Sequence, residues 1–265
     1  MDILLLSIKL VVSILVVLVL SLVAERVSPR IAGIVSGYPA GIAINLFFFG
    51  YEIGPVFAAE SALYTATGLL ATQSFVFFYY IASSRRSRQG VLSVSLMAFV
   101  GYLAVVWCVR QVPVNWVTAL LIPIGSIFLF LHLFRRIENS VIAEKVQLTP
   151  RVLFLRAFVS AGIIIMVTSL AHVVGPAYAG LFAAFPSTLF PLMLIIHMTY
   201  DVEHVHTIIK NFPLGLGSLI VYAILVALTY ESLGIFRGTL VAFAAATGYL
   251  LVFAVFVRRK RNQES

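Results

Sequence analysis

Long apolar runs are the feature that most constrains the fold of this chain. An α-helix needs about 20 mostly apolar residues to cross the ~30 Å hydrocarbon core of a bilayer, and nine segments of the sequence meet this requirement. Of the 265 residues, 62% are hydrophobic and only 11% are charged, whereas about a quarter of a soluble domain is charged. These values exclude a soluble enzyme, a disordered chain and a fibrous repeat. The nine segments cover residues 3–24, 29–50, 56–82, 90–109, 115–134, 152–174, 176–198, 203–230 and 235–257.

We therefore expect an all-α, polytopic membrane helix bundle with about nine transmembrane helices. The first segment differs from a cleaved signal peptide, because its apolar run is long and no basic residue precedes it.

The distribution of positive charge supports nine crossings. The formal net charge is +8, and nine crossings place 15 of the 18 Lys and Arg residues on one side, with Lys9, Arg110 and Arg237 on the other. Basic residues concentrate on the cytoplasmic side of membrane proteins. The sequence thus predicts a multi-pass protein of the cell (inner or plasma) membrane, with its N-terminus outside and its C-terminus cytoplasmic. The charge then gives no reason to expect a nucleic-acid partner.

The longest polar stretch, residues 135–151, carries apolar residues at helical spacing. Two interpretations stay open. It forms either a short helix at the inner membrane interface or an ordinary cytoplasmic linker.

The sequence also repeats itself, without gaps, at an offset of 147 residues. Matching apolar residues mean little between membrane helices, but Pro, Gly and basic positions match in one register across four segments. The matched positions include Lys9 with Arg156, Pro29 with Pro176, Gly33 with Gly180, Pro39 with Pro186, Gly68 with Gly215, and Gly101 with Gly248.

This repeat divides the chain into three parts. A first four-helix unit covers residues 1–110, a connecting transmembrane helix and linker cover 111–151, and a second four-helix unit with a basic tail covers 152–265. Because five segments precede the second unit, it crosses the membrane in the opposite sense, which gives a 4+1+4 inverted-topology repeat. Inverted repeats are common among secondary transporters.

Several motifs of the second unit carry a family resemblance. They are Ala179-Gly180-Leu181, Phe185-Pro186-Ser187, His197 and Gly215-Leu216-x-Ser218-Leu219-Ile220-x-Tyr222. With these motifs, residues 176–225 resemble the GlpM-like family of small bacterial inner-membrane proteins, whose members are similar in length to one unit. The resemblance implies a fused, inverted pair of such units and names no substrate. The first unit departs from the pattern, with Gly50 in the place of His197.

Two prolines lie at matching depths within predicted membrane helices. Pro39 and Pro186 each lie ten residues into a segment, which is about 15 Å into a ~30 Å core. Proline removes a helical hydrogen bond and frees a carbonyl, which in lipid must find a partner or line a cavity. Paired breaks predict a midplane substrate site, unless they are kinks that only shape packing. The candidate substrate-binding residues are Gly37, Pro39, Gly41, Pro186, Ser187 and Thr188.

Four ionisable residues are candidates for gating or ion coupling. Lys9 and Arg156 occupy matching positions in the repeat. They form either a pair of cationic gates for an anionic solute or lipid headgroup, or side chains that extend to the nearest membrane interface. Glu60 is a candidate proton or cation site, or a solvated interfacial residue. His197 begins a polar region that reaches His206 and lacks the HxxxH and HExxH spacings of metal sites, so we expect a solvated loop and no metal.

The sequence lacks the common motifs of nucleotide-binding proteins and hydrolases. The sequence has no P-loop, dinucleotide fingerprint, GxSxG elbow or Ser/His/Asp pattern, so we expect no cofactor and no enzymatic activity. The leading hypothesis is a secondary or facilitated transporter that moves a small solute or amphiphile through the midplane site. The alternatives are a non-transporting membrane component that assembles or stabilises a partner complex, and a lipid-modifying enzyme using the His197–His206 region. The lipid bilayer is the expected partner, and a homo-oligomer stays open.

Overall fold

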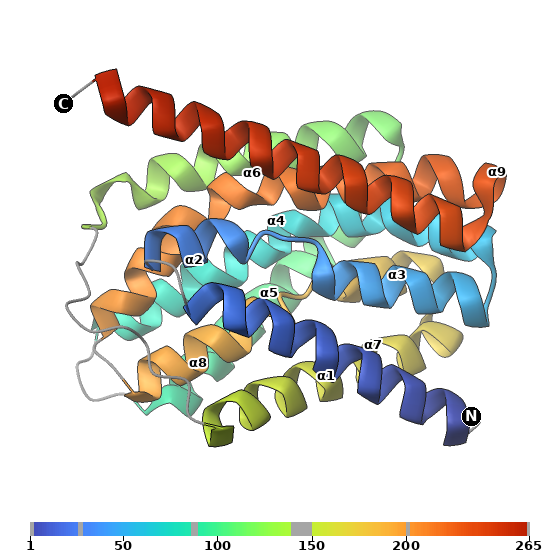
Figure 1. Ribbon diagram of the computed structural model, residues 1–265, viewed down its shortest axis with the longest axis horizontal. Coiled ribbons are helices and arrows are strands. Elements are labelled where there is room, and N and C mark those ends of the chain that lie inside the picture. Colours follow the sequence, from blue (N-terminus) through green and yellow to red (C-terminus); the bar gives the residue numbers. More distant parts are fainter. Residues whose placement is uncertain (1–2, 26–28, 86–89, 139–149, 200–201, 264–265) are drawn as a thin grey trace.

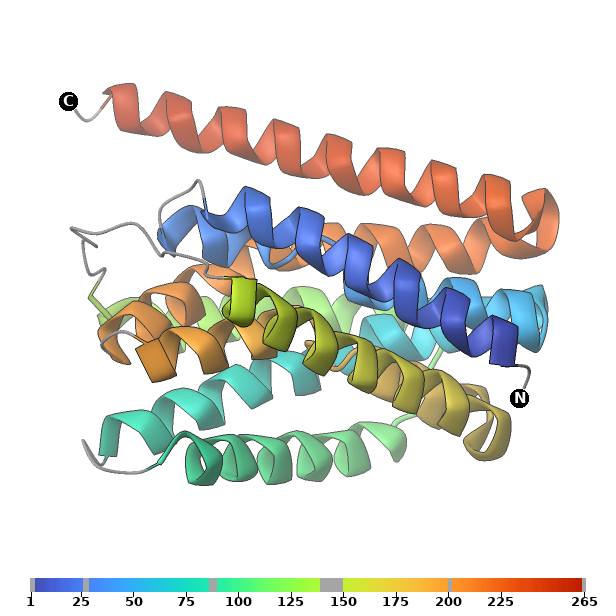
Figure 2. The same cartoon turned by 60° about the horizontal axis from the view of Figure 1, so that its bottom comes forward.

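The computed structural model describes residues 3–25, 29–85, 90–138, 150–199 and 202–263. These residues form helices without any β-strand, which confirms the expected all-α class. The helices run broadly along one common axis (Figures 1 and 2). They are α1 (Ile3–Glu25), α2 (Pro29–Val35), α3 (Ala40–Glu52), α4 (Pro55–Arg85), α5 (Val91–Arg110), α6 (Trp116–Leu133), the 3-10 turn η1 (Phe134–Arg136), α7 (Pro150–Ala183), α8 (Leu189–Thr199) and α9 (Val202–Gln263).

Two of these helices contain a sharp break at a glycine. Gly175 in α7 has φ 74° and ψ 172°, and Gly234 in α9 has φ 76° and ψ 166°. Glycine adopts positive φ without the steric cost that a side chain imposes. At Gly234 the chain reverses, so that the two halves of α9 run back along each other (Figure 1).

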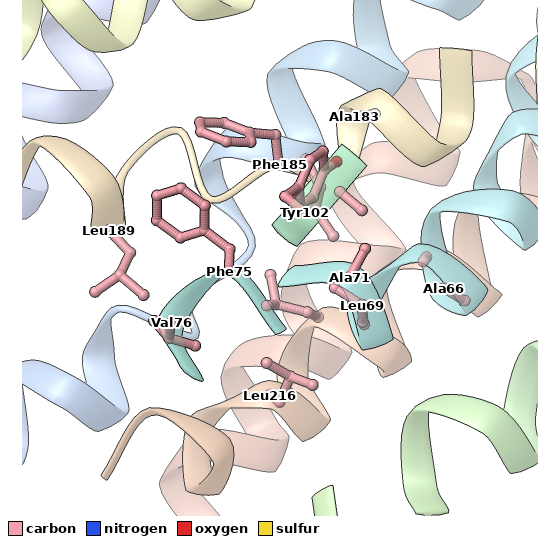
Figure 3. Close-up of a cluster of buried hydrophobic side chains, with 14 of the residues drawn as sticks. Ala66, Leu69, Ala71, Phe75, Val76, Tyr102, Ala183, Phe185, Leu189 and Leu216 are labelled. Carbon is pink, nitrogen blue, oxygen red and sulfur yellow. The ribbon is translucent and has the colours of Figure 1, made fainter. Parts of the chain in front are cut away.

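Helix α4 lies at the centre of the bundle. It packs against α3, α5, α6, α7 and α9. Ala58, Ala62 and Ala66 on α4 are fully buried, and such small side chains let neighbouring helices approach closely. Larger α4 side chains, including Leu69 and Phe75, fill the buried cluster beyond them (Figure 3).

Within the described residues, five helices are long and apolar enough to cross a membrane. They are Gly33–Glu52, Val91–Arg110, Trp116–Arg136, Leu153–Ala183 and Val202–Phe253. The last has 52 residues, and at ~1.5 Å per residue it greatly exceeds the ~30 Å core, so its reversal at Gly234 is required for it to fit. These apolar helices are compatible with an integral membrane protein. The nine-crossing inverted repeat stays a prediction.

The outer surface of the bundle is rich in large apolar side chains. Leu92 on α5, Phe128 on α6 and Leu240 on α9 are examples, and all three are exposed. Soluble monomers rarely expose large contiguous apolar patches, whereas lipid would cover this surface. Trp107 and Trp116 are exposed on either side of the α5–α6 connection, where an aromatic belt at the membrane interface would place them.

The start of α1 and the end of α9 lie at opposite ends of the bundle (Figures 1 and 2). Residues 139–149 lie outside the described residues. The choice between an interfacial helix and a linker over residues 135–151 therefore stays open.

We predict that Gly180→Ala destabilises the protein, whereas Gly125→Ala does not. A Cβ at Gly180 would overlap the Ser61 carbonyl oxygen on α4, but one at Gly125, exposed on α6, would meet nothing within 4 Å. Overpacking costs about 1–3 kcal/mol, and alanine is favoured over glycine within a helix by about 1 kcal/mol. Thermal unfolding in detergent measures both variants. Equal melting temperatures would contradict the close α4–α7 approach.

Candidate functional site

Two interruptions of helical structure define the candidate site. The first, residues 36–39, separates α2 from α3, and the second, residues 184–188, separates α7 from α8. They contain Pro39 and Pro186, the two prolines for which the sequence predicted breaks. Figure 3 shows the second interruption running from Ala183 to Leu189.

Close backbone packing stabilises the first interruption. A tight turn forms as the Gly37 and Tyr38 amides donate to the carbonyls of Ile34 and Val35, at 3.0 and 2.8 Å. Gly37 packs directly against Gly215 of α9, with no room for a Cβ atom. The Gly37 carbonyl accepts a hydrogen bond from the Ser218 hydroxyl, also on α9.

Side chains from four helices satisfy the carbonyl groups in and before the second interruption. The donors are Thr65 to Gly180 (3.0 Å), Tyr102 to Leu181 (2.6 Å), Asn45 to Ala183 (3.5 Å), Thr72 to Ala184 (2.5 Å) and Ser160 to Ser187 (2.8 Å). The donors Thr65 and Thr72 belong to α4, and Tyr102 belongs to α5. In an apolar medium an unpaired carbonyl costs several kcal/mol, so these donors allow the chain to leave the helical conformation here.

The second interruption touches the first turn of α3, which directly follows the first interruption. A Cβ added at Gly41 would overlap the Ser187 hydroxyl oxygen and would lie 3.6 Å from Cγ2 of Thr188. Among the described residues the Ser187 hydroxyl has no hydrogen-bond partner, although it is fully buried. All six candidate substrate-binding residues are buried. Gly41, Ser187 and Thr188 meet here, whereas Gly37 contacts α9 instead.

Lys9 is fully buried and forms an ion pair. Its Nζ lies 2.6 Å from Oε1 of Glu52, donates to Oγ1 of Thr168 at 3.1 Å, and lies 5.5 Å from the centre of the Phe48 ring. The other Glu52 oxygen lies 3.0 Å from Nε2 of His172. This network joins α1, α3 and α7. Glu52 was not among the predicted site residues because it lies just beyond the apolar segment 29–50.

Arg156, the repeat counterpart of Lys9, is buried without such a partner. It is only 3% exposed. Its Nε and Nη1 atoms have no hydrogen-bond partner among the residues that the structure describes. The two matched cations thus have opposite environments.

The remaining candidates lie away from the interruptions. Glu60 is exposed near the start of α4. His197 on α8 is half-buried, with its Nδ1 atom 2.8 Å from the hydroxyl of Tyr79 on α4. His206 on α9 likewise contacts α4, with Nε2 2.8 Å from the Ser83 hydroxyl. Each histidine therefore ties α4 to a neighbouring helix.

Metal ligands do not gather in the described part of the chain. No group of three or more His, Cys, Asp or Glu side chains there could hold a metal ion.

An apolar groove lies beside the second interruption. Its volume is about 470 Å³. Phe185 of the interruption and Phe75 of α4 line it, together with Tyr102 of α5, and these three side chains are drawn in Figure 3. Sequence reasoning missed this groove because it forms between α4, α5, α7 and α8, whose lining residues look like ordinary packing residues.

A comparison with known proteins finds no family model, no curated protein and no solved structure that matches this chain. The resemblance of residues 176–225 to the GlpM-like family stays a prediction.

We predict that Thr72→Val destabilises the protein by about 1–3 kcal/mol, because it leaves the buried Ala184 carbonyl unpaired. Thr67→Val is the matched control. Thr67 is also buried on α4, but its hydroxyl bonds the Leu63 carbonyl one turn earlier, and the helix backbone already satisfies that group. Equilibrium unfolding in detergent compares the two. Equal destabilisation would show that Thr72 has no special role at the interruption.

A second prediction concerns the buried ion pair. Lys9→Met alone leaves the Glu52 carboxylate, which is 6% exposed, with only its His172 contact, and loss of one partner of a buried pair costs about 3–5 kcal/mol. The double variant Lys9→Met/Glu52→Leu should recover most of that loss. A double-mutant cycle on the unfolding free energy measures the coupling between the two residues. Strictly additive effects would show that Lys9 and Glu52 do not stabilise the fold as a pair.

Proposed function

We propose that the chain is an integral membrane protein that acts as a secondary or facilitated transporter of a small solute or amphiphile. The observation that carries this proposal is the contact of Ser187, in the second interruption, with Gly41, two residues beyond Pro39 of the first; the buried Ser187 hydroxyl has no hydrogen-bond partner among the described residues. Interrupted helices that meet within a membrane bundle are typical of transporter binding sites. The unpaired hydroxyl is available to hydrogen-bond a solute.

Matched helix contacts support the inverted repeat on which transport would depend. Gly33 packs against the Ile208 carbonyl, and Gly180 packs against the Ser61 carbonyl. The offset from Gly33 to Gly180 equals the offset from Ser61 to Ile208. Each contact is therefore the repeat image of the other, as a 4+1+4 arrangement of two equivalent units requires.

The chemistry of the site also favours transport over catalysis. The groups around the contact are glycine, proline and hydroxyl side chains, which can hold a polar solute but offer no activated nucleophile. In the inverted topology, exchange between outward-open and inward-open states moves such a solute without a bound nucleotide.

Reconstituted vesicles test this proposal. The purified protein in proteoliposomes is exposed to a defined mixture of sugars, amino acids, organic anions and short-chain amphiphiles, and uptake is quantified by mass spectrometry. We expect uptake of at least one class, reduced about tenfold or more by Pro39→Leu and by Pro186→Leu, since a tenfold effect needs only ~1.4 kcal/mol.

Pro123→Leu is the matched control, because Pro123 is also buried but lies inside helix α6 and away from both interruptions. Its uptake should match that of the wild type. Uptake no greater than in protein-free vesicles for every compound would overturn transport and favour a non-transporting membrane component.

A further inference from the structure

The environment of Arg156 is the starting observation. Burying a cation without a partner is costly, because the ion loses its hydration and gains no compensating interaction. The matched cation Lys9 avoids this cost through Glu52. Arg156 is 3% exposed and has two unpaired guanidinium nitrogens among the described residues. A bound anion would supply the missing interaction.

The apolar groove is the second observation. Leu92, Leu96 and Phe99 of α5 line one wall, and Ile163 and Val167 of α7 line another. Its lining is almost entirely apolar, which suits a hydrocarbon chain and not a polar solute. The three α5 side chains are also exposed, so the groove is open on the surface that lipid would cover.

The groove and the cation share one face of α7. Ile163 and Val167 follow Arg156 at spacings of seven and eleven residues, which place side chains on the same side of an α-helix. Arg156 and Ile163 are about 10 Å apart along the helix axis at ~1.5 Å per residue.

The second interruption joins the two regions. Ser160, one turn beyond Arg156, donates to the Ser187 carbonyl. Phe185, two residues earlier in the same interruption, lines the groove. A molecule that spans the groove and Arg156 would therefore contact the second interruption, which carries Ser187 of the proposed transport site.

We propose that this region binds an anionic lipid, with an acyl chain in the groove between α5 and α7 and the phosphate at Arg156. A guanidinium pairs with phosphate through charge-assisted hydrogen bonds, and the Nε and Nη1 atoms of Arg156 have no hydrogen-bond partner among the described residues. The assignment of this lipid as the transported amphiphile rests on the proposed function, whereas its binding does not.

Equilibrium binding to the purified, delipidated full-length protein tests the site by native mass spectrometry. The probes are dioleoyl phosphatidylglycerol, dioleoyl phosphatidylcholine with the same chains, and glycerol phosphate as a headgroup without chains. We expect phosphatidylglycerol to bind most tightly. Arg156→Gln should weaken it about tenfold or more, the expected effect of losing a charge-assisted hydrogen bond, and Arg156→Lys should weaken it less.

Two further variants separate the chain from the headgroup. Ile163→Trp fills the groove and should weaken both lipids, whereas Arg237→Gln removes an exposed cation on α9 and should change neither. The proposal is overturned if the two lipids bind equally to the wild type, if Arg156→Gln leaves phosphatidylglycerol binding unchanged, or if glycerol phosphate binds as tightly as the lipid.

Thermal stability gives an independent measurement. Arg156→Met removes an uncompensated buried charge, so it should raise the melting temperature of the delipidated protein and abolish the further rise that phosphatidylglycerol gives the wild type. A lower melting temperature in the delipidated state would assign Arg156 a structural role and overturn the proposal. Lipid binding without uptake in the vesicle assay would instead overturn the transport proposal, and the proposal of a lipid site would stand.

Discussion

The fold depends on which side chains donate hydrogen bonds to the backbone carbonyl groups at the second interruption. A chain that leaves the helical conformation inside an apolar bundle exposes carbonyl groups that water cannot reach. Here the compensating donors come from α3, α4, α5 and α7, so the unwound residues 184–188 lie at the meeting point of four helices. Because hydrogen bonds are directional, these donors also fix the positions of the helices that carry them. The central position of α4 follows from this requirement as well as from its small side chains.

The two interruptions solve the same physical problem in different ways. The first relies on direct backbone contact between Gly37 and Gly215 and on one hydroxyl, that of Ser218. The second relies on a set of long-range side-chain donors, with aromatic packing of Phe185 against Phe75 and Tyr102. The groove borders the second interruption, where Phe185 contributes to its lining.

The sequence was sufficient to predict the helical class and the positions of both interruptions, because proline and apolar run length act locally. It could not single out Thr72, since a helical threonine usually bonds its own preceding turn, as Thr67 does. It also missed Glu52, because a pairing between residues far apart in sequence depends on tertiary packing. Glu60 is exposed on α4, which is compatible with a solvated interfacial residue, and its role as a proton or cation site stays a prediction.

The contrast between the two matched cations has the clearest functional consequence. Lys9 and Arg156 match in the predicted repeat, and both are buried. However, Lys9 is neutralised within the protein by Glu52, and Arg156 is not neutralised by any described residue. Neutralisation within the fold contributes to holding α1, α3 and α7 together, whereas an unpaired buried cation contributes no stability by itself. An anion bound as proposed would offset the cost of burying Arg156, whereas Lys9 is already neutralised by Glu52.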